Sequence, residues 1–168
     1  MFPVHRCVLT ARSPVFRAQL FGEMKESKQT TGGVIVAIED MEAQVFISLL
    51  RFIYTDSLLE AEEDDDYWPM EQYQHLLVAA DRYGLERMKL ICQEKLCGHI
   101  CTNSVGRMLA LADQHHCPGL KEACFDFLSS STSLHLFTET DGVEVLTDSC
   151  PAVLKELLAK LATVLIIE

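Results

Sequence analysis

The segment from His5 to Ser27, HRCVLTARSPVFRAQLFGEMKES, decides the fold of this sequence. It predicts two short helices in series, joined at a sharp corner and followed by a polar loop. Ser13 can cap the second helix with its hydroxyl, Pro14 suits the first helical position, and Gly22 suits a helix end. The segment carries more apolar surface than two short helices can bury, so it must pack against the rest of the chain. The residues that supply this surface are Val8, Leu9, Val15, Phe16, Leu20 and Phe21.

One short strand and one long helix are predicted next. The β-branched run at 34–38 predicts a strand, and apolar residues on a wide face predict a helix at 42–55. Because Ile47 and Phe52 lie off that face, we expect this helix to be buried nearly all round. One strand cannot form a sheet alone, so either further strands escape this pattern or part of the sheet is missing.

The remainder of the sequence is helical in pattern after a loop at 56–69, in which residues 60–66 hold six acids. This acidic run is typical of a solvated surface loop, and it lacks the ligand spacing of a calcium site. Between 134 and 148 the pattern is weak and suggests a short helix at each end. The clearer apolar repeats predict helices at 71–83, 86–98, 103–116, 119–129 and 152–165.

Composition excludes several classes of protein. A length of 168 residues fits one domain with an attached extension, and a net charge of −11 argues against a nucleic-acid partner. Seven cysteines without a signal peptide indicate a reducing compartment, so we expect a soluble protein of the nucleus or the cytoplasm. The last apolar run, 161–167, is shorter than the ~18 residues that a membrane span needs, so we expect no membrane association.

The sequence offers little chemistry. It contains no nucleophile elbow, P-loop or dinucleotide-binding glycine pattern, so we expect no enzyme and no cofactor. A zinc site would have to use Cys92, Cys97, His99 and Cys101, whose spacing departs from that of known zinc sites. Buried thiols and surface histidines explain these residues better, and a small zinc or thiol protein remains the less favoured alternative. Arg12 ends a helix, where a cation meets the helix dipole favourably.

Three blocks in order resemble a BTB/POZ domain: HRCVLTARSPVFRAQLFGEMKES, VIVAIEDMEAQVFISLLRFIYTD and LLVAADRYGLERMKLICQEKLC. The likeness is closest to the MATH-BTB (speckle-type POZ-like) family of plants, whose members are substrate adaptors of cullin-3 ubiquitin ligases. The acidic run before the third block is similar to that of the plant members. SVGRMLALADQHHCPGLKEACFDFL then resembles the helical pair that follows the BTB core, the start of a BACK-like extension.

This resemblance implies an α+β fold that is mostly helical. Residues 1–100 would form a BTB/POZ core of helical hairpins with an incomplete small sheet, and 101–168 a BACK-like helical extension. The family's dimer interface falls on Val8, Leu9 and Arg12. Its hydrophobe-x-Glu contact with cullin-3 falls on Met24, Lys25 and Glu26.

The resemblance also implies a function, a non-catalytic interaction module of the ubiquitin pathway that binds cullin-3 and itself or other BTB proteins. Two departures qualify it. The family's first strand hairpin is expected before His5 and does not precede it here, which puts dimerisation in question. No MATH domain precedes the BTB blocks either. An alternative function is therefore a regulator that lacks a substrate domain and forms heterodimers with full-length adaptors.

Overall fold

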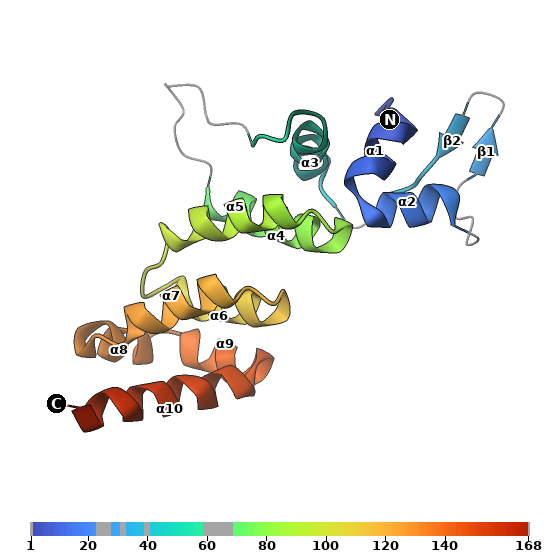
Figure 1. Cartoon of the computed structure of the whole chain (residues 1–168). Helices are drawn as coiled ribbons and strands as arrows, with labels where there is room; N and C mark the ends of the chain where they lie inside the picture. Colours follow the sequence, from blue (N-terminus) through green and yellow to red (C-terminus); the bar gives the residue numbers. More distant parts are fainter. Residues whose placement is uncertain (1, 23–27, 31–32, 39–40, 59–68, 168) are drawn as a thin grey trace, which may run out of the picture. The chain divides into compact units, whose positions relative to one another are not determined.

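The structure is a computed structural model that describes residues 2–22, 28–30, 33–38, 41–58 and 69–167 (Figure 1). The chain forms two compact units, one up to Cys92 and one from Gln93. Within the described ranges it is mostly helical, as the sequence predicts. The elements of the first unit are α1 (Arg6–Arg12), α2 (Pro14–Phe21), β1 (Lys28–Thr30), β2 (Gly33–Ile35), α3 (Ala43–Thr55), α4 (Met70–Tyr83) and the start of α5 (Glu86–Cys97).

The corner between α1 and α2 forms as predicted, and the structure adds a distant partner to it. The Ser13 hydroxyl accepts the N–H of Phe16 at 3.2 Å and caps α2. The same hydroxyl donates to the carbonyl of Tyr83, at the end of α4, at 2.6 Å. Gly84 follows with φ +66°, and a Cβ there would lie 2.7 Å from the ring of Pro14. Glycine is therefore required both by the backbone conformation and by the close approach.

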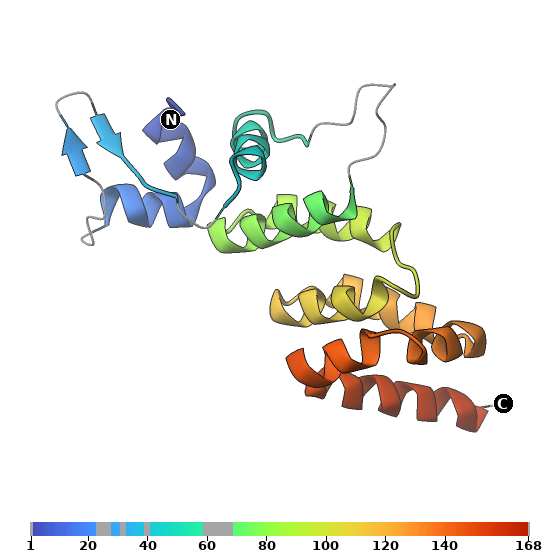
Figure 2. The ribbon, with the colours of Figure 1, turned by 180° about the vertical axis from the view of Figure 1, so that it is seen from behind.

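The predicted strand is only partly correct. β2 covers Gly33–Ile35 and pairs antiparallel with β1, Lys28 opposite Ile35 and Thr30 opposite Gly33. Residues 36–38 are not strand, because the three residues of β1 end the ladder at Ile35. The sequence did not predict β1, because its residues, Lys-Gln-Thr, are all polar and do not alternate with apolar residues. Figure 2 shows this hairpin on the side of the first unit that carries α2. Within the described residues it is the whole sheet.

α3 is central to the first unit, but it is not buried all round. Leu49, Phe52 and Ile53 are at most 2% exposed and pack toward α1 and α4. Ile47 and Tyr54, on the same helix, are 42% and 44% exposed. The expectation of all-round burial was wrong for Ile47, because the elements that pack on α3 cover only the side that carries its apolar stripe.

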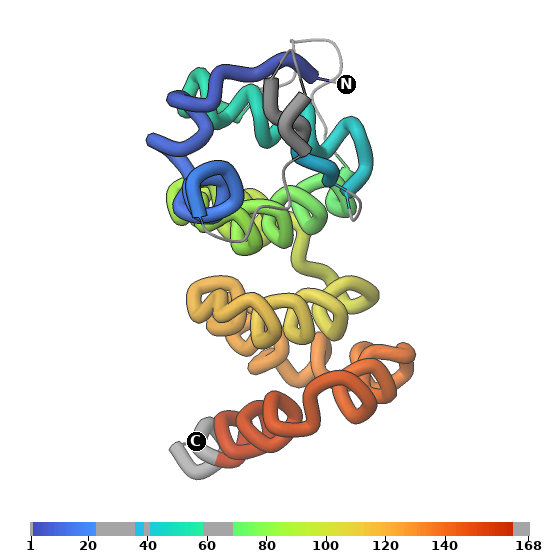
Figure 3. Tube along the Cα trace, turned by 90° about the vertical axis from the view of Figure 1, so that its right-hand side faces the viewer, coloured from blue at the N-terminus to red at the C-terminus, as the bar shows by residue number. Residues whose placement is uncertain are grey.

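The second unit is entirely helical where the structure describes it. The weakly patterned stretch at 134–148 does contain parts of two short helices, α8 (Ser131–Thr138) and α9 (Gly142–Ser149). Pro118 and Pro151 open α7 (Pro118–Leu128) and α10 (Pro151–Ile167). Figure 3 shows the chain doubling back between α6 and α7, and again between α9 and α10. The elements are the end of α5, then α6 (Val105–Gln114), α7 (Pro118–Leu128), α8 (Ser131–Thr138), α9 (Gly142–Ser149) and α10 (Pro151–Ile167).

Ion pairs connect three helices of this second unit. Lys121 on α7 contacts Asp113 on α6 at 2.9 Å and Glu156 on α10 at 2.7 Å. Partial burial disfavours its ammonium group, but the hydrogen bonds with Glu156 and Asp113 outweigh this cost and raise the pKa of Lys121. Lys160 on α10 pairs in the same way with two carboxylates of α7. The charges thus hold α10 against α7 beside the apolar core.

A close backbone contact between α6 and α9 gives the first prediction. A Cβ on Gly106 would lie 2.8 Å from the Cα of Gly142 and 3.0 Å from its carbonyl oxygen. Because backbone atoms cannot rotate away, Gly106→Ala should lower the free energy of unfolding by about 1–3 kcal/mol. Urea unfolding followed by circular dichroism measures this change.

The matched control is Gly119→Ala on α7. Its Cβ would meet only Gln93 Oε1 at 3.8 Å, which is an ordinary contact. Alanine has the higher helix propensity, so this variant should be neutral or more stable by up to about 1 kcal/mol. Equal unfolding midpoints for the two variants would contradict the close approach of α6 and α9.

Candidate interaction surface

A groove of about 430 Å³ lies between α1 and α3. Its α1 side is built from neighbouring positions of the helix, which present small apolar side chains and one cysteine. Its α3 side is the last turn of that helix. An arginine and an aspartate also line the groove, and the complete lining is Cys7, Val8, Ala11, Arg12, Ile53, Tyr54, Thr55 and Asp56.

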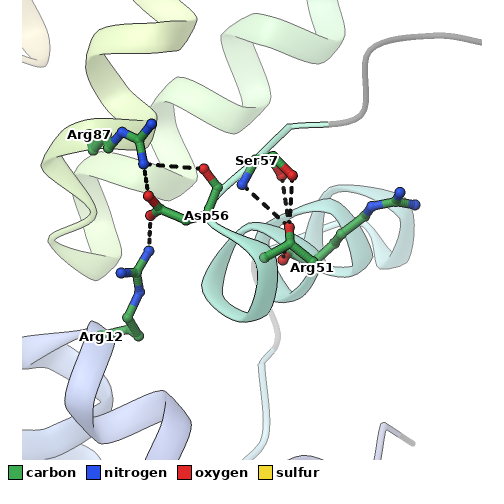
Figure 4. A network of polar contacts seen from close by, with 6 residues as sticks. Arg12, Arg51, Asp56, Ser57 and Arg87 are labelled. Carbon is green, nitrogen blue, oxygen red and sulfur yellow. Dashed lines mark hydrogen bonds and ion pairs between the residues drawn. The ribbon is translucent and has the colours of Figure 1, made fainter.

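A charge cluster includes two of the residues that line this groove, Arg12 and Asp56. Figure 4 shows the contacts of the cluster. Asp56 follows the last residue of α3, and its carboxylate pairs with Arg12, the last residue of α1, and with Arg87, in the first turn of α5. Arg87 also donates to the Asp56 carbonyl at 3.4 Å. Two guanidinium groups share one carboxylate, so the cluster carries a net positive charge. It connects the ends of three elements that lie far apart in the sequence.

Asp56 also has a special backbone. Its φ is 59°, in the left-handed region, and its N–H donates to the Phe52 carbonyl at 2.8 Å as the C-cap of α3. Aspartate tolerates this conformation better than most residues other than glycine and asparagine. The left-handed turn ends α3 where the side chain of Asp56 can meet both arginines.

The residues before α1 are fixed on α3. The hydroxyl of Tyr54 accepts the backbone N–H of His5 at 2.8 Å and lies 3.1 Å from its ring Nδ1. The ring of Phe2 packs on Phe46 with centroids 5.5 Å apart. These contacts fix the start of α1 beside the groove.

The structure places the predicted dimer residues in different environments. Val8 is half-buried and lines the groove, whereas Leu9 is only 5% exposed and belongs to the core of its own chain. Arg12 ends α1, as predicted, and also binds Asp56. Its ion pair with Asp56, which Arg87 shares, was not predicted from the sequence. None of these observations tests dimerisation, which stays a prediction.

The predicted cullin contact, Met24, Lys25 and Glu26, lies outside the described residues. The structure does describe the end of α2 just before it, with Gly22 as the C-cap that the sequence predicts. The acidic run at 60–66 is also outside the described ranges.

The cysteines provide no cluster of ligands. In the described part of the chain, no three His, Cys, Asp or Glu side chains lie where they could hold a metal ion. Burial raises the pKa of Cys124 to about 12 and also raises that of Cys97. Exposed Cys101 differs, because its hydrogen bond with the Ser104 hydroxyl lowers the pKa of its thiol. Nor is any described helix both long and apolar enough to cross a membrane.

Comparison with known proteins decides the family. The family model for the BTB/POZ domain matches residues 1–100. The chain belongs to the BTB/POZ domain family. A further model, the BACK domain of the BPM/SPOP type, matches residues 104–158 of this BTB/POZ protein. The order of the two matches agrees with the resemblance seen in the sequence.

Two relatives from Arabidopsis thaliana match nearly the whole chain. BTB/POZ and MATH domain-containing protein 3 is 38% identical over 165 residues, which is 96% of this chain and 40% of that protein. BTB/POZ and MATH domain-containing protein 4 is 36% identical over 169 residues, 96% of this chain and 35% of that protein. The BTB/POZ chain thus spans well under half the length of these relatives.

The α1–α3 groove belongs to the part of the chain that matches the BTB/POZ domain. BTB/POZ domains are protein-interaction modules, and the groove with its charge cluster lies within residues 1–100, the part that matches the BTB/POZ domain. Its lining combines apolar side chains with an arginine and an aspartate, a mixture that is typical of a surface that binds protein. The surface is therefore a candidate interface of this BTB/POZ domain.

Asp56→Asn tests the charge cluster. Asparagine keeps the left-handed turn but loses both ion pairs, which are 37–64% exposed and well screened. We expect a loss of up to about 1 kcal/mol in the free energy of unfolding at low salt, and a smaller loss at about 1 M NaCl. Urea unfolding measures both.

Asp148→Asn, which changes an exposed carboxylate on α9, is the control for Asp56→Asn and should stay within about 0.5 kcal/mol of the original protein. If Asp56→Asn behaves like this control at low salt, the cluster does not stabilise the fold.

Proposed function

We propose that this BTB/POZ chain is a non-catalytic adaptor that binds the N-terminal region of a cullin-3 scaffold. The observation that supports this most is the match to a BTB/POZ domain followed by a BACK domain of the BPM/SPOP type. The likeness to BTB/POZ and MATH domain-containing proteins extends over 96% of the chain. Adaptors of this kind position partners and perform no chemistry themselves.

The proposed scaffold contact is the segment Met24, Lys25 and Glu26. Methionine adapts its shape to an apolar pocket, and a carboxylate two residues away can fix the orientation of the partner. The segment begins three residues after the end of α2. The Ser13 corner fixes that helix on α4, so the segment starts from a well-supported point.

Dimerisation through α1 is the second part of the proposal. Val8 lies in the α1–α3 groove and is half-buried in the single chain, so a partner could cover it further. Leu9 would support α1 from the core side, and Arg12 would fix its end through Asp56. A second copy or another BTB protein could fill this groove.

Substitution in the proposed segment tests the cullin contact. Met24→Ala combined with Glu26→Lys should abolish binding to a cullin-3 N-terminal region, because it removes the apolar contact and reverses the charge. Leu90→Ala combined with Glu86→Lys makes the same two changes at exposed positions of α5, outside the proposed segment, and this matched control should bind normally. Calorimetry with the purified proteins measures the affinity. If the original chain does not bind at micromolar concentration, the adaptor proposal is wrong.

Val8→Asp tests the dimer. A carboxylate in a buried apolar interface is costly, so this variant should have the mass of one chain where the original protein has the mass of two. Size-exclusion chromatography with light scattering measures the mass. Val78→Asp makes the same change on an exposed position of α4 and should leave the mass unchanged. A Val8→Asp variant that is still dimeric would exclude the α1–α3 groove as the interface.

A further inference from the structure

Phe21 is the last residue of α2, and it is 64% exposed. Other large apolar side chains are exposed on this protein, so exposure alone carries no conclusion. The conclusion depends on what fixes the ring of Phe21. The Arg6 guanidinium lies over it, with its carbon 4.9 Å from the ring centroid. Arg6 is itself fixed, because its Nη2 donates to the carbonyl of Leu20 at 3.2 Å.

This arrangement keeps an exposed aromatic ring in one orientation before any partner binds. A cation–π contact stabilises the ring position from one side and leaves the other side available. Pre-organisation lowers the entropy cost of binding, and aromatic side chains are enriched among the residues that contribute most to interfaces. Phe21 therefore has the properties of an interface anchor.

The covalent chain places Phe21 beside the proposed cullin contact. Met24 is three residues further on, so the two Cα atoms are separated by at most about 11 Å even in a fully extended chain. A standard protein interface covers about 800 Å² on each partner, equivalent to a disc of about 16 Å radius. A partner centred on Met24 therefore reaches the position of Phe21.

We propose that Phe21, held by Arg6, is a second apolar anchor of the surface that binds the cullin-3 N-terminal region. The inference rests on the proposed function. It adds a residue outside the hydrophobe-x-Glu motif and a positioning role for Arg6. The partner would have to present an apolar pocket for the ring next to the pocket for Met24.

The test measures the affinity of the full chain for a cullin-3 N-terminal region by calorimetry. Phe21→Ala should weaken binding by about tenfold or more. Phe21→Tyr keeps the ring and its contact with Arg6 and should stay within about twofold of the original affinity. Arg6→Ala should weaken binding less than Phe21→Ala, because the ring remains but loses its fixed position. Circular dichroism confirms that the variants are folded.

Leu90→Ala is the matched control. Leu90 lies on α5 and is 62% exposed, nearly the same as Phe21. It should bind like the original chain. If Phe21→Ala binds within about twofold of the original, or if Leu90→Ala weakens binding equally, Phe21 is not an anchor. In either case the adaptor proposal stands if the Met24→Ala, Glu26→Lys variant still fails to bind. If the original chain does not bind, the proposed function itself fails, and this inference fails with it.

Discussion

The hydroxyl of Ser13 is the contact on which the first unit depends. Ser13 is 1% exposed, and a buried hydroxyl without partners would cost free energy. The hydroxyl accepts a hydrogen bond from the N–H of Phe16 and donates one to the carbonyl of Tyr83, 70 positions away. It is therefore satisfied both as an acceptor and as a donor. The ring of Phe16 stacks on that of Tyr83 with centroids 4.6 Å apart. One side chain thus caps α2 and joins the α1–α2 corner to the end of α4.

The proposed functional features extend from this corner in two directions. Toward the N-terminus, α1 lies beside α3, which creates the groove at Val8 and brings Arg12 to Asp56. Toward the C-terminus, α2 ends at Phe21, just before the proposed cullin contact. Since α1 ends and α2 begins at the same fixed corner, the proposed dimer surface and the proposed scaffold surface of this BTB/POZ domain have a common support. A change at the corner would therefore affect both.

The cysteines show how packing decides the role of a residue type. Cys92, Cys117 and Cys124 are at most 1% exposed and fill apolar space like other small core side chains. The high pKa of Cys124 means that its thiol stays protonated and unreactive at neutral pH. An odd number of cysteines is then compatible with a stable fold, because each buried thiol contributes by packing.

Sequence alone determined the local structure of this protein. Apolar periodicity predicted most of the helices, and capping chemistry predicted Ser13, Pro14 and Gly22 at their ends, because these preferences act within a few residues. The family resemblance was also readable, because it rests on blocks of residues in order.

Tertiary structure decided the rest. The bond from Ser13 to Tyr83, the sharing of Asp56 by two arginines and the contact of Gly106 with Gly142 join residues that are distant in the sequence. β1 was missed because its three polar residues form a strand only through pairing with β2, and Ile47 is exposed because no described element covers it. No local preference encodes such contacts, since each depends on which elements pack together.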